Sequence, residues 1–252
     1  MTTLILSLAA GTVVGLALGG LGGGGSVLAV PALIYLLGFT PAAATTAGLL
    51  IVIATSLTGL VAHARQSGVR WRTGALFAAA GIIPAALAGA LSTRIPPGLL
   101  TAAFAALAVV AAVRMIRPRP APPERDGATD AVPPGRAVRA GAGLGAVTGL
   151  LGVGGGFLAV PALVTVLALP MSAAVGTSLL VITVNSTAAL ATRLTSPVAL
   201  DWAVIAPFTA AAILGAWDGR RLAAKISTAA LQRVFGVVLL GVALFMLVDA
   251  VA

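Results

Sequence analysis

Long apolar runs with almost no charged side chain recur from one end of this chain to the other. Ala42 to Ala62 and Thr73 to Ser92 are two of them, and both exceed the ~18 residues that indicate a helix crossing a bilayer. Only 8% of the 252 residues are charged, against about 25% in soluble domains. The runs therefore exclude a soluble fold and predict an all-α, polytopic membrane protein.

The positive net charge lies between the apolar runs. Lys and Arg number 15 against 6 Asp and Glu, which gives a net charge of +9. In a polytopic protein such residues mark cytoplasmic loops, so nucleic acid is not an expected partner. The chain has no cysteine and one histidine, His63, which argues against disulfides, thiolate chemistry and a metal site. No cofactor is expected.

A duplicated motif indicates that the chain contains two copies of one unit. Residues 21–33 (LGGGGSVLAVPAL) and 151–163 (LGVGGGFLAVPAL) match at ten of 13 positions. The same offset along the chain pairs Ser56 with Ser186. We therefore expect two related halves that fold alike.

Domain boundaries follow from this repeat. The first copy covers residues 1–116 and the second covers 138–252. Between them, residues 117–137 are rich in Pro and Arg, a composition that predicts a solvated linker on the cytoplasmic side.

Loop charges place equivalent loops of the two copies on opposite sides of the membrane. Residues 65–72 in the first copy carry three arginines, whereas the equivalent residues 193–201 are nearly uncharged. The next loop of the second copy, residues 218–225, is basic again. The positive-inside rule then predicts inverted repeats, with both chain ends outside the cytoplasm. Inverted repeats are typical of secondary transporters, in which one copy moves against the other to give alternating access.

The second apolar segment of each copy is short. Val27 to Gly38 and Phe157 to Leu169 have 12 and 13 residues, or roughly 20 Å of helix against ~30 Å of hydrocarbon. We expect the first two segments of each copy to form a helical hairpin that turns back, or a pair of short tilted spans. Three full spans follow in either case.

A glycine run precedes each short segment. Backbone amides that leave a helix inside a membrane need other partners, so such a break must face protein or a water-filled cavity. The short helix that follows presents free N–H groups and a positive dipole end, which suit an anion. The alternative is that glycines only let helices approach closely, as we expect of Gly11, Gly15 and Gly19. The residues predicted to bind the anion at the breaks are Gly24, Gly25, Ser26, Gly154, Gly155 and Gly156.

Small polar side chains in the third segments form a second candidate feature. Hydroxyl and amide groups can hydrogen-bond an oxyanion without adding fixed charge. The alternative is bonding between helices or back to the helix itself, although an amide in the middle of a span is costly without a partner. Two hydroxyls of the second copy stand where the first has Ala47 and Gly48, so we expect the second copy to supply more hydrogen bonds. The candidates are Thr46, Thr55, Thr177, Ser178 and Asn185.

Catalytic chemistry finds little support in the sequence. No carboxylate lies in the middle of a span, which also argues against a cation carrier or a proton relay. Ser26 with His63 as its base would suggest an intramembrane protease, but Gly156 stands at the position of Ser26 in the second copy. We therefore expect a protein that is not an enzyme.

With these motifs the chain resembles the sulfite exporter TauE/SafE family of multi-pass membrane proteins. The resemblance rests on the two Gly-rich motifs ahead of Val-Pro, on AVGTSLLVI from Ala174 to Ile182, and on the Arg/Pro-rich linker. It covers nearly the whole chain. It implies export of small sulfur oxyanions or organosulfonates, such as sulfite or sulfoacetate, across the bacterial inner membrane.

Other functions remain open at this point. Composition and spacing alone indicate a transporter with an anion-friendly centre, and a carrier or channel for another small anion or a neutral solute fits the same features. A membrane partner subunit that transports nothing is a further alternative. The expected partners are a small anionic substrate and the lipid bilayer, and the oligomeric state is open, a homodimer included.

Overall fold

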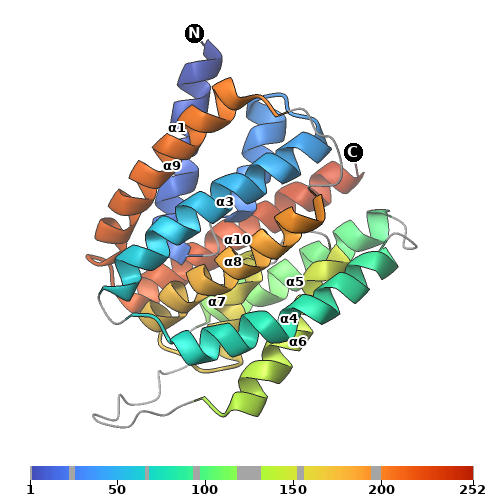
Figure 1. The fold of residues 1–252 in the computed structure, drawn as a ribbon, viewed down its shortest axis with the longest axis vertical. Coiled ribbons are helices and arrows are strands. Elements are labelled where there is room, and N and C mark those ends of the chain that lie inside the picture. The colour runs from blue at the N-terminus through green and yellow to red at the C-terminus, as the bar shows by residue number, and fades with distance from the viewer. Residues whose placement is uncertain are drawn as a thin grey trace.

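The computed structural model describes residues 2–22, 26–65, 68–92, 97–117, 132–151, 156–193 and 200–251. Every regular element within these ranges is a helix (Figure 1), so the all-α class is confirmed. In chain order the elements are α1 (Thr2–Leu21), α2 (Ser26–Pro31), the π-helix η2 (Ala32–Leu36), α3 (Pro41–Ala64), α4 (Trp71–Ser92), α5 (Pro97–Ile116), α6 (Pro134–Leu151), α7 (Gly156–Thr165), α8 (Met171–Arg193), α9 (Trp202–Ala223) and α10 (Thr228–Val251).

The helix starts follow the repeat. α3 and α8 begin at Pro41 and Met171, which the offset between the two motifs makes equivalent positions. α4 and α9 both begin at a tryptophan, Trp71 and Trp202. α6 begins at Pro134, inside the segment assigned to the linker. Proline is well suited to the first turn of a helix, because the N–H group that it lacks has no intrahelical partner there.

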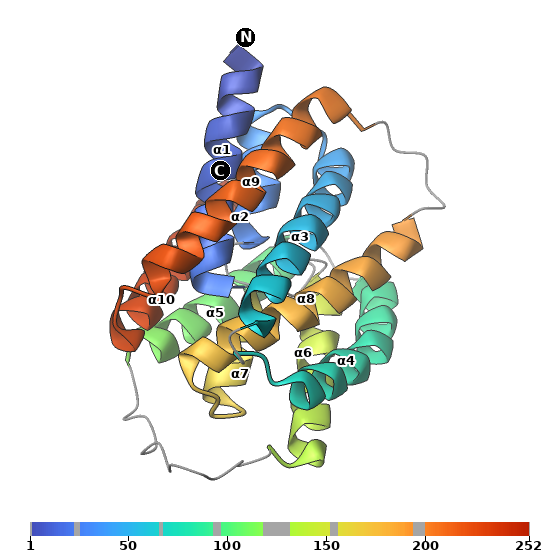
Figure 2. The same ribbon diagram turned by 60° about the vertical axis from the view of Figure 1, so that its left-hand side comes forward.

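Helices of one copy pair mainly with helices of the other. α1 packs along α9, α4 along α6, α5 along α10, and α3 crosses α8 near the centre (Figures 1 and 2). Exchanging each helix for its repeat equivalent turns the α1–α9 pair into the α4–α6 pair and maps the α5–α10 and α3–α8 pairs onto themselves. The packing therefore has the pattern of a pseudo-two-fold arrangement.

Glycines bring α1 and α9 into backbone contact. A Cβ atom added at Gly11, Gly15 or Gly19 would collide with the carbonyl oxygens of Phe208, Ala212 and Ala216, respectively. Both sets step by four residues in the same direction, so the two helices run parallel. The close approach expected from the four-residue glycine spacing is confirmed.

The equivalent pair α4 and α6 uses the same device. A Cβ atom at Gly141 would collide with the backbone of Phe77, and one at Gly145 with the backbone of Gly81. These contacts again step by four residues in the same direction, so α4 and α6 also run parallel.

The central pair, α3 and α8, runs antiparallel. The Ser56 and Thr183 hydroxyl oxygens lie 2.9 Å apart, and a Cβ atom at Gly59 would lie 3.1 Å from Leu179 Cδ1. Residue numbers rise along α3 while they fall along α8. Two equivalent helices therefore point in opposite directions where the copies meet.

The outer faces of the helix assembly suit a lipid environment. Five helices among the described residues are long and apolar enough to span a membrane: Thr2–Leu21, Ala42–Ala64, Trp71–Ala88, Met171–Ala191 and Trp202–Ala223. Large apolar side chains stay exposed on them, with Ile83 and Leu214 each 70% exposed. At 20 residues, α1 is itself as long as a span. The choice between a hairpin and a tilted pair stays a prediction.

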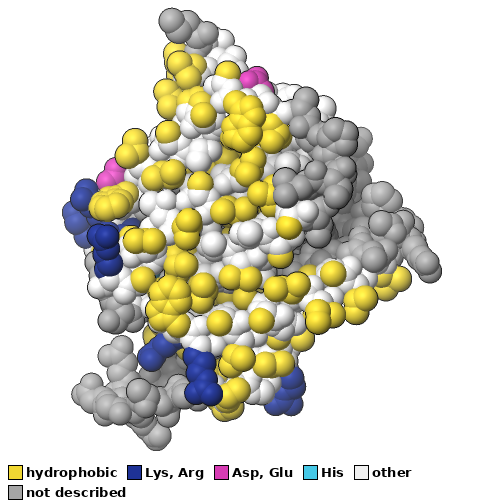
Figure 3. Space-filling model, viewed as in Figure 1, with side chains coloured by type: hydrophobic (Ala, Val, Ile, Leu, Met, Phe, Trp, Pro, Cys, Tyr) yellow, Lys and Arg dark blue, Asp and Glu magenta, His cyan; other side chains and the backbone are white. Residues whose placement is uncertain are grey.

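Basic side chains gather at one end of the molecule. Figure 3 shows Lys and Arg along the left and lower margins of this face, over the end of α9 and the starts of α4 and α6, and none on its upper part. Four chain segments carry basic residues at this end: residues 65–72, the two flanks of the linker, and residues 220–233. Their clustering agrees with the loop charges read from the sequence.

The short helices of the two copies end in the same turn. The Phe39 N–H donates to the Leu33 carbonyl, and the Leu169 N–H donates to the Leu163 carbonyl, each at 3.0 Å. The residue before each donor has a positive φ, +70° at Gly38 and 55° at Ala168. This is the left-handed residue that commonly ends a helix, and alanine pays a steric cost there that glycine does not.

We expect Gly145→Ala to destabilise the protein and Gly143→Ala, on the same helix, to leave it unchanged or slightly more stable. The new methyl at residue 145 meets the Gly81 backbone, whereas nothing lies within 4 Å of it at residue 143. Overpacking costs about 1–3 kcal/mol, which outweighs the ~1 kcal/mol gain in helix propensity. Thermal unfolding in detergent measures the difference. Equal melting temperatures for the two variants would contradict the close packing of α4 and α6.

Ala168→Gly should raise stability by about 0.5–1 kcal/mol, because glycine relieves the left-handed backbone at some cost in unfolded-state entropy. Gly38→Ala is the matched reverse change: nothing lies within 4 Å of the added methyl, so only the backbone conformation penalises it. Melting temperatures of the two variants should move in opposite directions. A shift of both in the same direction would rule out this explanation.

Candidate functional site

Described helices flank both glycine runs. α1 ends at Leu21 and α2 begins at Ser26, while α6 ends at Leu151 and α7 begins at Gly156. Gly22 has already left the helix, with a φ of +65°. A short helix therefore begins after each run, as the sequence predicts. Of the glycines predicted to bind the anion, Gly24, Gly25, Gly154 and Gly155 lie outside the described residues.

The short helices lie inside the assembly. Ala29 and Leu33 in the first copy, and Ala159, Val160 and Leu163 in the second, are completely buried. Their neighbours come from both copies, because one core cluster joins α2 to α1, α3 and α9 and another joins α7 to α4, α6 and α8. Each break is thus followed by a helix surrounded by protein, the setting in which a membrane tolerates interrupted backbone.

The edge of the first break lies against the polar part of α8. A Cβ atom at Gly22 would lie 2.9 Å from Ser178 Oγ and 3.1 Å from Val175 Cγ1. On α3, a Cβ atom at Gly48 would lie 3.0 Å from a methyl of Val30 in α2. Gly48 and Ser178 are repeat equivalents, so the same level of both central helices meets the broken-helix region.

Three of the predicted hydroxyl ligands bond back to their own helix. Thr46 donates to the Ala42 carbonyl at 3.0 Å, Thr55 to the Ile51 carbonyl at 2.7 Å, and Ser178 to the Val175 carbonyl at 2.7 Å. Their protons are committed in this conformation, so they would have to rotate to donate to an oxyanion. This is the back-bonding that the sequence left open as the alternative.

Thr177 is used differently. Its hydroxyl oxygen accepts a hydrogen bond from the Arg70 backbone N–H at 3.0 Å, and the residue is fully buried. The bond fixes the loop before α4 against α8. Ala47 stands at the equivalent position in α3, so the first copy cannot make the same bond.

Asn185 carries a buried carbonyl oxygen, Oδ1, that has no hydrogen-bond partner among the described residues. It lies near the crossing of α3 and α8, two residues beyond Thr183. A buried amide oxygen without a partner costs about 1–3 kcal/mol, and polar side chains inside membrane spans are costly unless they are paired. Among the proposed ligands whose side chains the structure describes, Asn185 is the one with a buried polar atom that has no partner.

Sequence reasoning missed Thr183. Its hydroxyl donates to the Leu179 carbonyl at 2.7 Å, so it accepts from Ser56 across the helix crossing. The signal was present in the repeat, because Ile53 is its equivalent and a polar residue therefore occurs there only in the second copy. Metal ligands are not gathered anywhere in the described ranges, where no group of three or more His, Cys, Asp or Glu could hold an ion.

Comparison with known proteins places the whole arrangement in one family. The family model for the sulfite exporter TauE/SafE matches residues 7–246. The chain belongs to the TauE/SafE family. A probable membrane transporter protein of Xylella fastidiosa (strain 9a5c) is 35% identical over 251 residues, which cover 97% of this chain and 95% of that protein. Its counterpart in strain Temecula1 is 33% identical over 250 residues, with the same shares of the two chains. No solved structure matches the chain.

This TauE/SafE protein is thus a multi-pass membrane transporter whose polar centre is unequal between the two copies. The second copy provides Thr177, Ser178, Thr183 and Asn185, whereas the equivalent residues of the first are Ala47, Gly48, Ile53 and Thr55. That the second copy supplies more hydrogen bonds to a bound anion stays a prediction.

We expect the Ser56 and Thr183 hydroxyls to stabilise the α3–α8 crossing jointly. A double-mutant cycle with Ser56→Ala and Thr183→Val should give a coupling of about 0.6 kcal/mol, the usual size for such bonds in membrane proteins. Unfolding of purified protein in detergent measures it. Strictly additive effects would show that the two hydroxyls do not interact, and Thr187→Val, an exposed back-bonded threonine on the same helix, serves as control.

Proposed function

We propose that this transporter exports small sulfur oxyanions or organosulfonates, such as sulfite or sulfoacetate, and binds them where α3 crosses α8 beside the two helix breaks. The observation that carries the proposal is the buried amide oxygen of Asn185, which has no hydrogen-bond partner among the described residues. An asparagine amide can flip and exchange its carbonyl for an NH₂ group, so the same position can present two donors to an anion. A ligand would then remove the cost of the unpaired buried group.

The rest of the binding site follows from the position of the breaks. Main-chain N–H groups at the start of α2 and α7 would face the anion, and hydroxyls that turn away from their carbonyls would complete its shell. No lysine or arginine is needed at this depth, so the anion is held by dipoles and can leave again. The proposed set is Gly24, Gly25, Ser26, Thr46, Thr55, Gly154, Gly155, Gly156, Thr177, Ser178 and Asn185.

Alternating access is the mechanism that we propose for this fold. Equivalent helices α3 and α8 run antiparallel at the centre, and the pairing pattern is preserved when the copies are exchanged. Both features support two copies of opposite orientation in the membrane. A site on the axis between such copies can open to one side or the other by equivalent movements.

The basic end of the molecule supports one orientation in the membrane. We propose that residues 65–72, the linker and residues 218–225 face the cytoplasm, because Lys and Arg accumulate in cytoplasmic loops. Both chain ends would then lie outside the cytoplasm, and the membrane would be the bacterial inner membrane. The substrate and the surrounding lipid are the partners expected for this function.

Replacement of Asn185 by leucine should lower sulfite flux into or out of proteoliposomes by about tenfold or more, the effect of losing roughly 1.4 kcal/mol of binding. Combined with Gly155→Leu, it should abolish flux. Thr187→Val on the same helix is the control, since its exposed hydroxyl bonds only to the Thr183 carbonyl. Unchanged sulfite and sulfoacetate flux in the double variant would defeat the assignment of the site.

Transport of another small anion or of a neutral solute is the second candidate. It is favoured by one observation: the hydroxyl protons of Thr46, Thr55 and Ser178 are already donated to carbonyls. Competition of sulfate, thiosulfate and sulfoacetate against labelled sulfite in the same vesicles separates the candidates. Inhibition by sulfur oxyanions alone supports the first, and equal inhibition by unrelated solutes supports the second.

A further inference from the structure

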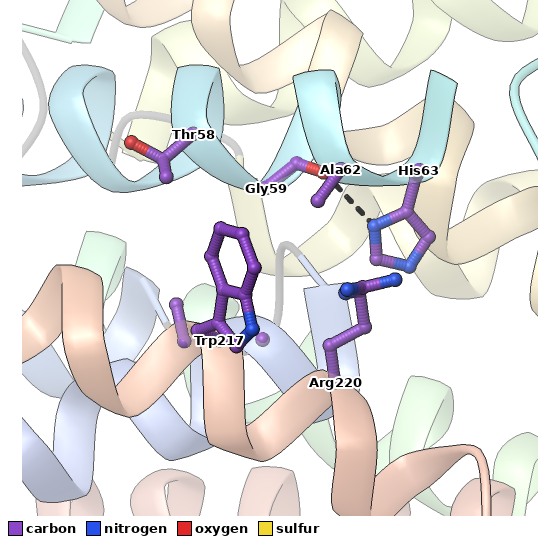
Figure 4. Close-up of a pocket in the computed structure, with 8 residues that line it drawn as sticks. Thr58, Gly59, Ala62, His63, Trp217 and Arg220 are labelled. Carbon is purple, nitrogen blue, oxygen red and sulfur yellow. Dashed lines mark hydrogen bonds between the residues drawn. The ribbon is translucent and has the colours of Figure 1, made fainter. Parts of the chain in front are cut away.

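A small cleft opens between α1, α3 and α9. Small residues form part of its walls, and His63, Trp217 and Arg220 supply its larger side chains (Figure 4). It contains about 240 Å³ of empty space including its open mouth, while its enclosed part has room for about one water molecule. The cleft therefore suits a group of a few atoms at its mouth. The complete lining is Gly19, Thr58, Gly59, Ala62, His63, Ala216, Trp217 and Arg220.

Arg220 brings an unused donor and an uncompensated charge to this cleft. Its Nε atom is buried and has no hydrogen-bond partner among the described residues. The adjacent Arg221 differs, because it forms an ion pair with Asp218 at 3.6 Å in which both side chains are well exposed. Across the described ranges, Arg220 has no carboxylate within ion-pair distance. Burying a guanidinium donor without an acceptor is costly, so the site favours an incoming anion.

Neighbouring side chains hold the guanidinium in place. The Cζ atom of Arg220 lies 5.8 Å from the centre of the Trp217 ring, within cation–π range. His63 points toward Arg220 from α3, and its Nδ1 is 3.0 Å from the Gly59 carbonyl oxygen (Figure 4). A carbonyl can only accept, so Nδ1 donates and the other ring nitrogen is not used in this bond. The cleft thus contains the guanidinium of Arg220, held in place, and the imidazole of His63 beside it.

We infer that this cleft is a second oxyanion site, in which Arg220 Nε and a terminal nitrogen of the same guanidinium bind two oxygens of a small anion. A guanidinium matches two oxygens of one phosphate, sulfite or sulfonate group in a planar, two-bond geometry. The small residues of the walls leave space for such a group and for little more. The site goes beyond the proposed function, because it requires binding alone and shares no residue with the set proposed to bind the transported anion.

Two sources can supply this chemistry. One is a free oxyanion in solution, and the other is the phosphate of an anionic lipid, because basic pockets between membrane helices also bind lipid head groups. The cleft lies near the basic end of α9, where either can reach it. Either source would bind Arg220 through two oxygens of one anionic group. A free anion exchanges with the solution, whereas a lipid is retained when the protein is purified.

The test compares Arg220→Gln with Arg221→Gln, two neighbours of equal charge of which only the first lines the cleft. Sulfite is titrated calorimetrically into purified protein in nanodiscs of neutral lipid. Arg220→Gln should weaken one binding event by about tenfold or more, the loss expected for a charge-assisted pair, and Arg221→Gln should change it less than about twofold. Arg220→Lys, which keeps the charge but loses the fork, should fall between them.

A second arm detects the lipid source. Protein purified from membranes that contain phosphatidylglycerol is examined by native mass spectrometry. Loss of bound phosphatidylglycerol in Arg220→Gln but not in Arg221→Gln identifies the lipid phosphate as the occupant, whereas sulfite binding that depends on Arg220 identifies a free anion. Equal behaviour of the two variants in both arms overturns the inference. Melting temperatures confirm that each variant is folded.

The central site and the cleft can fail independently. Asn185→Leu should leave the event that depends on Arg220 intact and remove the other. If Asn185→Leu changes neither flux nor binding while Arg220→Gln still weakens binding, the crossing is not the transport site. The cleft then remains an oxyanion site. If Asn185→Leu alone has an effect, the cleft does not bind an oxyanion.

Discussion

A main-chain amide that leaves its helix inside a bilayer must find another partner, and this requirement organises the whole transporter. A long helix ends at each glycine run, and both following short helices are buried between long ones. One of the long helices, α8, places Ser178 against Gly22 at the edge of the first run. A break that faced lipid would expose several unpaired groups, each at a cost of several kcal/mol. The arrangement of the other helices serves to keep that region enclosed.

The region is enclosed because helices of one copy pack against helices of the other. α1 of the first copy packs on α9 of the second, and α6 of the second packs on α4 of the first, both with glycines in direct contact with the facing backbone. Such contacts depend on close fit along the helix and do not stretch gradually. A movement that pulled one complete copy away from the other would break both interfaces. The alternating access that we propose is therefore easier if these mixed pairs stay intact and the antiparallel crossing of α3 and α8 changes instead.

Much of the fold was predictable because membrane helices obey local rules. Apolar length located the spans, the repeat located equivalent helices, and glycine runs located the interruptions. The four-residue spacing of Gly11, Gly15 and Gly19 predicted a close contact between helices. It did not identify α9 as the partner, because any helix with a smooth face fits the same spacing. Thr183 and Arg220 were missed for a related reason. Thr183 matters because Ser56 lies against it, and Arg220 matters because no acceptor among the described residues lies against its Nε. Both facts depend on tertiary packing.

The two copies carry different side chains at equivalent positions, although their helices are arranged with pseudo-two-fold symmetry. This difference bears on the direction of transport. In the alignment of the two copies, Thr177 and Ser178 correspond to Ala47 and Gly48, and Arg220 corresponds to Gly89. Under the proposed alternating access, the two ends of the path would therefore bind an anion with different strength. Different affinities alone cannot produce net export, because reversible binding shifts populations without supplying free energy. What the asymmetry can set is the concentration range over which each side is occupied, so the direction of net flux must come from the gradients across the membrane.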